Sequence, residues 1–442
     1  MILSDLEIKE ALNSISSEVL NGQNFSRKAF ARSIINYPAM MIPSVQEPII
    51  KSLADAFQGE VSLFDPFMGA SNTLVTGMKY GFNVFGQDIN PLSLLISQVK
   101  TTYYSWEELK EAENSLRNKV SIDSSSNREI HFQNIDKWFK AEIQIELSKL
   151  KRAIESEPSL KIRKFCWVAL AEVVRLTSND RTSTFKMHIR SNIDVQSRNL
   201  SAVETFFTIL KRSIKDIHDY CSLLFKNGLI EDNKYKKFAE VSWGDSMESV
   251  NTDKTFNLLV TSPPYGDNQT TVTYGQFSYL PLQWLPIEDI DVNITMSYLK
   301  TMQEIDTNSL GGKMIPKYQE NAEMLFDKSE TLKQLFDSFD SVDKKRARKV
   351  INFFHDLDKS IDKISTKLSR GAFMVWTIGN RNVNKRVVRN DLILTELLYS
   401  KQVELIADLD RDILSKRMPS RNSFSETMSK EKILIFKTVI SA

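Results

Sequence analysis

The 442-residue sequence has few of the residues that build disulfide frameworks or metal centres. Its two cysteines, Cys166 and Cys221, are too few for a disulfide framework. The 4 histidines are scattered, and the sequence contains no HExxH motif and no paired Cys/His spacing. We therefore predict an intracellular protein with neither a structural nor a catalytic metal ion.

Long hydrophobic runs are also absent. No stretch reaches the roughly 18 apolar residues of a membrane span. The first residues, MILSDLEIKEALNS, include acids and lack the basic region of a signal peptide. Because 41% of the residues are hydrophobic, the chain can nevertheless bury a large core. We expect a soluble, cytoplasmic protein that does not associate with membranes.

The sequence also lacks a strong charge of either sign. Its formal net charge of +2 excludes the overall basic character of histone-like or ribosomal proteins, so any nucleic-acid site must be local. Three basic runs are candidates, although such runs more often form a solvated helix face or loop. They are KKRARK (Lys344 to Lys349), RNVNKRVVR (Arg381 to Arg389) and SKRMPSR (Ser415 to Arg421).

Seven short apolar segments have the character of buried parallel strands. Helical patterns separate most of them, which predicts right-handed βαβ units and an α/β fold with a doubly wound sheet. The seven segments are 60–67, 82–89, 238–246, 256–264, 371–379, 403–410 and 431–439.

A first insertion, residues 101–237, interrupts this alternation and is expected to be mostly helical. Apolar residues of 135–154 fall on one helical stripe, and those of 203–224 fall on another. The second stripe follows the capping-box pattern Ser201-x-x-Glu204, which predicts a helix beginning there.

A second insertion, residues 286–345, has a loop-rich character, and a helix resumes at Val350. The sheet is then expected to come from 1–100, 238–285 and 346–442.

Acidic residues follow three of the predicted strands. Asp65 in FDPFMGASNT precedes Gly69, whose missing side chain lets a ligand approach the backbone. Asp88 in GQDINP comes about 20 residues later, as does the acid that binds ribose in dinucleotide sites. Asp245 in WGDS is suited to an adenine amine. Each acid alone is equally a helix cap or turn residue, but three at neighbouring strand ends predict a ligand site.

A phosphate-binding loop is missing from the sequence. There is no GxGxxG and no GxxxxGK[ST], so a pyrophosphate or triphosphate would lack its usual cradle. The ligand indicated is an adenosine without phosphates, and S-adenosylmethionine fits that description.

The stretch LLVTSPPYGDN, residues 258–268, ends an apolar run with two prolines. Pro263 and Pro264 cannot donate to a sheet ladder, so they leave nearby carbonyls free in a rigid loop. By itself SPPY is as typical of a tight turn with a surface tyrosine as of a functional site.

Taken in order, FDPFMGASNT, GQDINP, WGDS and TSPPY resemble the motifs of the DNA amino-methyltransferases, which methylate the N4 amine of cytosine or the N6 amine of adenine. INYPAMMIPSVQEPIIKSL (35–53) is similar to the family's segment at the methionine end of the cofactor, and SNDRTSTFKMH (178–188) and KRMPSRNS (416–423) are similar to segments of related enzymes. The resemblance covers the sheet domain from about residue 30 onward. It implies a Rossmann-like class I methyltransferase fold with a mostly parallel seven-stranded sheet, a large helical insertion and a second, smaller one.

The resemblance also implies a role for each motif, with Asp88 at the ribose and Asp245 at the adenine. Ser71 stands where the family usually has a second glycine, which leaves the backbone path of that loop open. The implied residues for S-adenosylmethionine are Tyr37, Pro38, Asp65, Pro66, Phe67, Gly69, Asp88, Ile89, Asp245 and Ser246, and those for the target base are Ser262, Pro263, Pro264 and Tyr265.

An exocyclic amine is a poor nucleophile because its lone pair is delocalised into the ring. The Ser262 hydroxyl and the Pro263 carbonyl would accept its hydrogens and orient the lone pair, while Tyr265 would stack on the flipped base. Within the family, serine at the first motif position favours cytosine N4, with adenine N6 as the alternative.

The expected partner is double-stranded DNA, with a cognate restriction endonuclease as a further candidate. Since the sequence ends at its last predicted strand, we expect the recognition of a DNA sequence to come from 101–237 or, second, from 286–345. Two alternatives are an RNA guanine-N2 methyltransferase, which shares DPF- and PPY-type motifs, and a catalytically silent nucleic-acid-binding protein.

Overall fold

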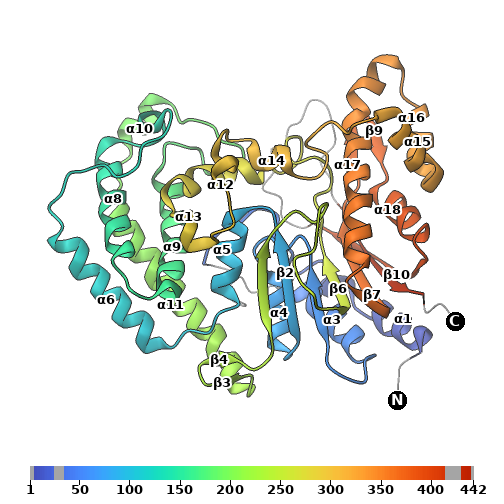
Figure 1. The fold of residues 1–442 in the computed structure, drawn as a ribbon, viewed down its shortest axis with the longest axis horizontal. Helices are drawn as coiled ribbons and strands as arrows, with labels where there is room; N and C mark the ends of the chain where they lie inside the picture. Colours follow the sequence, from blue (N-terminus) through green and yellow to red (C-terminus); the bar gives the residue numbers. More distant parts are fainter. Residues whose placement is uncertain (1–3, 24–33, 414–429, 440–442) are drawn as a thin grey trace.

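The computed structural model describes residues 4–23, 34–413 and 430–439. Seven strands form its central sheet, and each lies within or overlaps one predicted segment (Figure 1). They are β1 (Ser62–Asp65), β2 (Asn83–Asp88), β5 (Ala239–Trp243), β6 (Phe256–Thr261), β7 (Leu368–Ile378), β10 (Val403–Asp412) and β11 (Lys430–Thr438), in the spatial order β10-β11-β7-β6-β1-β2-β5.

Five of these strands, from β7 to β5, pair in parallel. The predicted Rossmann-like, mostly parallel seven-stranded sheet is therefore confirmed. The prediction that the last strand is also parallel was wrong, because β11 runs antiparallel to both β7 and β10. Its apolar run from Ile433 to Phe436 is buried on both faces like that of a parallel strand, and such a run does not encode strand direction.

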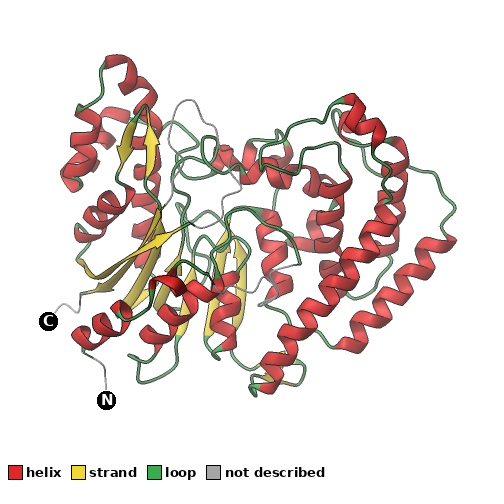
Figure 2. Cartoon of the chain, turned by 180° about the vertical axis from the view of Figure 1, so that it is seen from behind, coloured by secondary structure: helices red, strands yellow, loops and turns green. Residues whose placement is uncertain are grey.

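Helices cover both faces of the sheet, as the reverse view in Figure 2 shows. In β1, Leu63 belongs to the core on one face and Phe64 to the core on the other, which is the alternation expected of a strand. The first face packs against α1 (Asp5–Asn13), α2 (Ser17–Leu20), α3 (Pro43–Ala54), α4 (Asn72–Lys79) and α5 (Pro91–Lys100), and the second against α17 (Ser341–Ser365) and α18 (Asn390–Tyr399).

A helical bundle lies beside the sheet, at the left of Figure 1. Its core is continuous with that of the sheet, because α9 contacts both α5 and α12. The elements are α6 (Trp106–Ile122), α7 (Ile135–Trp138), α8 (Ala141–Glu155), α9 (Leu160–Thr177), α10 (Asn192–Ser197) and α11 (Ala202–Lys226), followed by the hairpin β3 (Ile230–Glu231) and β4 (Lys234–Tyr235) and later by α12 (Tyr274–Trp284).

Two predictions for this bundle have different outcomes. The helix beginning at Ser201 is confirmed, and the Ser201 hydroxyl accepts a hydrogen bond from the Glu204 N–H at 3.2 Å. The single stripe over 135–154 was wrong, since extended backbone at Phe139 and Lys140 separates α7 from α8. The apolar side chains keep helical spacing across this break, so periodicity alone does not reveal it.

The second insertion is mostly helical rather than loop-rich, which corrects the prediction. Its short helices bury single apolar residues such as Leu325 and Leu332, too few to give a clear helical period. Helix α17 begins at Ser341, before the predicted Val350, because the Asp340 side chain caps it by accepting from the Val342 and Asp343 N–H groups. The elements are α13 (Ile287–Ile290), η2 (Met296–Leu299), α14 (Glu304–Asn308), α15 (Tyr318–Lys328) and α16 (Glu330–Asp337); a hairpin of β8 (Arg381–Val383) and β9 (Arg386–Val388) follows β7.

A buried carboxyl fastens the ends of β1 and β6. Asp65 is fully buried, and its Oδ1 accepts hydrogen bonds from the Thr261 hydroxyl at 2.7 Å and from the Phe67 N–H at 3.2 Å. Burial raises the pKa of Asp65 to about 7, against the lowering effect of these hydrogen bonds. The side chain therefore joins two strand ends, although its burial makes the charged carboxylate unfavourable.

We expect Asp65→Asn to change how the free energy of unfolding depends on pH. Because the folded pKa lies above the unfolded value of about 3.9, the stabilisation by the protonated wild-type carboxyl is complete below about pH 4 and is lost as the pH rises through about 7. An amide does not ionise and still accepts from Thr261. The variant should therefore gain stability relative to the wild type between about pH 5 and about pH 8.5.

Urea unfolding at both pH values measures this difference. Asp55→Asn, at an exposed helix end, controls for the loss of one negative charge. A stability difference between Asp65→Asn and the wild type that is the same at both pH values would contradict the role given to this carboxyl.

Candidate active site

A cavity lies at the carboxyl ends of β1, β2, β5 and β6. The space between its walls is about 880 Å³, which includes open solvent at the mouth. Of the residues predicted from the sequence, Asp65, Pro263 and Tyr265 do not contribute to the described lining. Those that do are Tyr37, Pro38, Pro66, Phe67, Gly69, Asp88, Ile89, Asp245, Ser246, Ser262 and Pro264.

The segment before α3 forms one wall of the cavity. Tyr37 is buried, and its hydroxyl accepts a hydrogen bond from the Asn90 amide at 3.0 Å. Its ring contacts Tyr274 and Phe277 at the start of α12, with centroid distances of 5.8 and 5.5 Å. Burial raises the pKa of Tyr37 well above its usual value, so the phenol stays neutral. These contacts hold Tyr37 in the cavity wall, to which the next residue, Pro38, also contributes.

The loop after β1 brings backbone to the cavity surface. Gly69 has a left-handed backbone (φ 47°), and its N–H donates to Asp88 Oδ2 at 2.9 Å. Ser71 is also left-handed (φ 56°), and its buried hydroxyl bonds that of Ser97. Serine thus adopts the conformation that glycine favours, and this settles the backbone path that the sequence left open.

Asp88 is held at the end of β2 by two backbone donors. Besides the bond from Gly69, its Oδ1 accepts from the Asn90 N–H at 2.8 Å. Burial raises the pKa of Asp88. Each carboxylate oxygen has two lone pairs, so the side chain can still accept hydrogen bonds from hydroxyl groups of a ligand in the cavity.

Asp245 and Ser246 follow β5 and have different surroundings. Asp245 is half-buried, accepts from the Met247 N–H at 2.9 Å, and has a pKa that burial raises. The Ser246 hydroxyl donates to the Pro66 carbonyl at 2.9 Å and accepts from the Gln87 amide at 3.3 Å. Ser246 thus ties together the loops that follow β5 and β1, while Asp245 presents a carboxylate.

The TSPPY loop follows β6. Ser262 lines the cavity, and its hydroxyl lies 3.3 Å from the Tyr265 hydroxyl. Tyr265 in turn donates to Glu431 Oε1 at 2.9 Å, and Arg411 Nη1 lies 2.6 Å from Glu431 Oε2. Burial raises the pKa of Tyr265 well above its usual value. The tyrosine is therefore a neutral donor held by the β10–β11 pair.

Several lining residues were missed in the sequence. Asn90 and the Met40–Met41 pair lie inside quoted motifs and could have been found there. Asn268 ends the quoted LLVTSPPYGDN stretch, but it had no assigned role. Ala39, Met68, Ala70, Asn72, Thr73 and Gly244 also lie inside quoted motifs. Four lining residues lie outside every quoted motif, in α12 and in the second insertion, where no sequence signal placed them near the strand ends; they are Tyr274, Ile305, Ser309 and Leu310.

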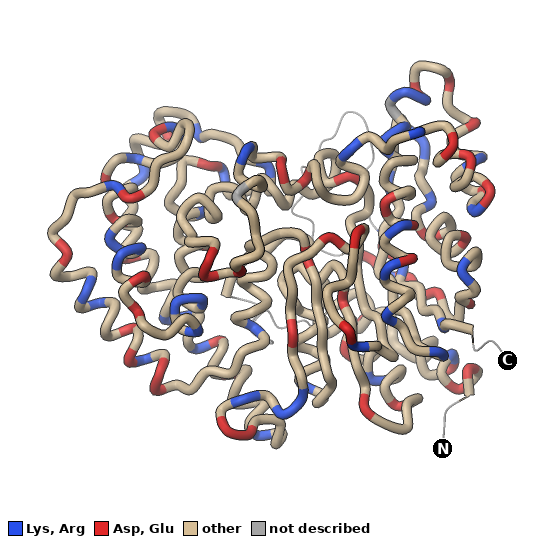
Figure 3. The backbone as a smooth tube through the Cα atoms, in the orientation of Figure 1, with Lys and Arg blue, Asp and Glu red and all other residues tan. Residues whose placement is uncertain are grey.

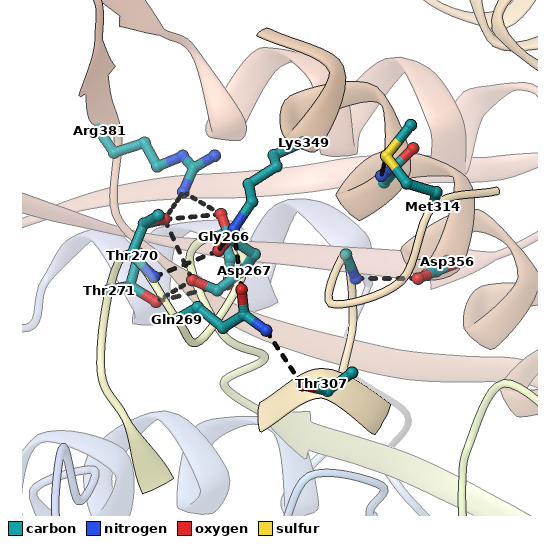
Figure 4. Close-up of polar contacts among 12 residues, drawn as sticks. Gly266, Asp267, Gln269, Thr270, Thr271, Thr307, Met314, Lys349, Asp356 and Arg381 are labelled. Carbon is teal, nitrogen blue, oxygen red and sulfur yellow. Dashed lines mark hydrogen bonds and ion pairs between the residues drawn. The ribbon is translucent and has the colours of Figure 1, made fainter. Parts of the chain in front are cut away.

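Two of the three basic runs lie within the described residues. Along the described backbone, lysine and arginine positions are interspersed with acidic ones (Figure 3). Lys349 on α17 and Arg381 on β8 turn toward Asp267, with Lys349 Nζ 3.2 Å from Oδ1 and Arg381 Nη1 3.6 Å from Oδ2 (Figure 4). One residue from each of two candidate basic runs thus holds the loop after TSPPY. The runs 415–421 and 416–423 lie outside the described residues.

Within the described ranges, no three or more His, Cys, Asp or Glu side chains gather as they would around a metal ion. None of the helices described is both long enough and apolar enough to cross a membrane.

Comparisons with known proteins identify relatives along most of the chain. The chain is 32% identical over 443 aligned residues to the type II methyltransferase M.MvaI of Kocuria varians, and the alignment covers 96% of this chain and 95% of that protein. It is 30% identical to the type II methyltransferase M.MjaII of Methanocaldococcus jannaschii over 32% of this chain and 28% of that one. It is 23% identical to the type II methyltransferase M.BsoBI of Geobacillus stearothermophilus over 60% of this chain and 58% of that one.

No protein-family model matches the chain. The first relative nevertheless aligns with it almost from end to end, so the likeness includes both insertions as well as the sheet. Together with a cavity lined by the motifs at four strand ends, this likeness shows that the chain belongs to the type II DNA methyltransferases.

Proposed function

We propose that this enzyme transfers the methyl group of S-adenosylmethionine to the N4 amine of a flipped cytosine in double-stranded DNA. The observation that carries the proposal is that Ser262 and Pro264 of the TSPPY loop share one cavity with Asp88 and Asp245. One end of this cavity offers acceptors to an adenosine, and the other offers acceptors to an amine.

The described residues fit S-adenosylmethionine. The carboxylates of Asp88 and Asp245 line the cavity and can accept hydrogen bonds from ribose hydroxyls and from an adenine amine. Gly69 has no side chain, so a ligand can come close to the backbone there. When bound, the cofactor supplies an electrophilic methyl group on a sulfonium. In this proposal, Asp88 binds the ribose hydroxyls and Asp245 binds the adenine amine.

At the other end, the chain must orient the target amine. The Ser262 hydroxyl is exposed to the cavity and, in this proposal, accepts one amine hydrogen, while the Pro263 carbonyl accepts another. Tyr265 stands beside Ser262, and the bond from its hydroxyl to Glu431 fixes the ring. Although Tyr265 is not part of the described cavity lining, in this proposal the base stacks on its fixed ring beside Ser262, and such stacking contributes roughly 1–3 kcal/mol per base.

We assign the reading of the DNA sequence to the helical insertion, 101–237, with contacts near the target base from 286–345. The second assignment is supported by Ile305, Ser309 and Leu310, which lie on the cavity wall. A cognate restriction endonuclease is the proposed partner of the enzyme in the cell, and the cytoplasm is its proposed location.

The identity of the methylated nucleoside tests the proposed function. We expect DNA incubated with the enzyme and radiolabelled S-adenosylmethionine, then digested to nucleosides, to contain N4-methylcytosine. N6-methyladenine would correct the base and keep the enzyme class, whereas label confined to RNA would overturn the proposal. Single-molecule sequencing of DNA from expressing cells then gives the recognition sequence.

Replacing Ser262 tests the amine acceptor. We expect Ser262→Ala to lower kcat by roughly 100-fold or more, since the variant loses an acceptor that orients the nucleophile. The affinity for S-adenosylmethionine, measured by titration calorimetry, should stay close to that of the wild type. Ser400→Ala is a matched control, because Ser400 is exposed at the C-cap of α18 before β10, at the opposite edge of the sheet. Full activity of Ser262→Ala would refute the assignment.

Two substitutions separate the ring of Tyr265 from its hydroxyl. We expect Tyr265→Ala to raise the KM for DNA and lower kcat by roughly 10- to 100-fold, because roughly 1–3 kcal/mol of stacking is lost. Tyr265→Phe keeps the ring and should retain most of the activity. If the two variants lost activity equally, the hydroxyl and its bond to Glu431, rather than stacking, would be the important feature.

A further inference from the structure

We infer that Asn268 binds the flipped base directly, pairing its side-chain amide with the target amine and with the neighbouring ring nitrogen. This inference rests on the proposed function and deepens it, because it adds a base-contacting residue to the TSPPY loop.

The first observation is an amide without hydrogen bonds on the cavity wall. Asn268 lines the cavity and is only 3% exposed. Its Oδ1 is shielded from water and has no hydrogen-bond partner among the residues that the structure describes. A buried amide oxygen is unfavourable without a donor, so a ligand that supplies one would bind here.

The second observation is the place of Asn268 within the cavity. It belongs to the same loop as Ser262 and Pro264, which begins at the end of β6. The acids assigned to the cofactor follow β2 and β5, which lie on the other side of β1 in the sheet. Asn268 therefore stands at the end of the cavity where the amine is bound.

The third observation is a charged cluster that fixes this loop (Figure 4). The neighbouring Asp267 is 1% exposed and accepts from the Thr270 hydroxyl at 2.6 Å, and it also meets Lys349 and Arg381. Gly266 completes the arrangement, because a Cβ there would lie 1.9 Å from Arg381 Nη1. The backbone that carries Asn268 is thus fixed before the base arrives, as an efficient site requires.

The chemistry of an asparagine amide matches the reacting edge of the base. It carries one acceptor and one donor group side by side. Cytosine presents its N4 amine beside the N3 acceptor, and adenine presents its N6 amine beside N1. Asn268 Oδ1 then accepts one amine hydrogen in place of the Pro263 carbonyl, which does not line the cavity, and Ser262 accepts the other, so both hydrogens are held and the lone pair is oriented.

Asn268→Ala and the isosteric Asn268→Asp test this inference. Using unmethylated phage DNA and radiolabelled S-adenosylmethionine, we expect both variants to lower kcat by roughly 10- to 100-fold. Cofactor affinity should stay within about twofold of the wild type. The Asp variant cannot donate to the ring nitrogen while ionised, so its kcat should recover in part as the pH falls, which a purely structural role would not produce.

The control is Asn227→Ala. Asn227 is exposed at the C-cap of α11, and the segment just after it contacts Gly81 and lies at the amino end of β2, away from the cavity. Melting temperatures report whether each variant folds. Wild-type kcat in a folded Asn268→Ala would overturn the inference, as would weakened cofactor binding at unchanged kcat. If the wild type itself transferred no label to DNA, the proposed function would fail first.

Discussion

Parallel pairing of β6, β1, β2 and β5 is the constraint on which the site depends. Parallel strands end at the same edge of a sheet, so residues far apart in the sequence, such as Asp88 and Ser262, line one cavity. The interiors of β1, β2 and β6 are mostly apolar and buried, which fixes the register; Leu63 pairs with Leu258 and Phe64 with Phe85. A slip of one residue would turn these side chains to the opposite face, and the polar strand ends would no longer meet.

Buried polar side chains then hold the strand ends together behind the lining. Asp65 joins β1 to β6 through Thr261, and Ser246 joins the loop after β5 to Pro66. Gln87 of β2 donates to the Ser249 carbonyl at 2.7 Å and so supports the same corner. In a low-dielectric interior such hydrogen bonds are stronger than they are in water. Some motif residues, such as Asp65 and Ser246, therefore hold the walls of the cavity together, which is a role that needs no contact with a ligand.

The sequence predicted what local patterns encode and missed what arises only in the folded chain. Apolar runs located all seven strands, and the motifs that follow four of them contain most of the described lining, although fewer than half of the lining residues were assigned to the site individually. Neither the direction of β11 nor the break at Phe139 changes the spacing of the apolar residues. The sequence pattern therefore could not reveal either feature. The pairing of Lys349 and Arg381 with Asp267 joins segments more than 80 residues apart, and the same basic runs had suggested a surface for nucleic acid.

Both insertions contact the start of α12, which contributes to the cavity wall. From the helical insertion, the Phe185 carbonyl accepts from the Thr273 hydroxyl at 3.2 Å, and the Met187 N–H donates to the Gln276 side chain. From the second insertion, Asp306 accepts from the Gly275 N–H at 2.8 Å. Thr273 gives α12 no side-chain cap, so Asp306 stabilises this helix end in its place. Tyr274 lies within the same turn and lines the cavity, so both insertions are hydrogen-bonded to a turn that forms part of the cavity wall.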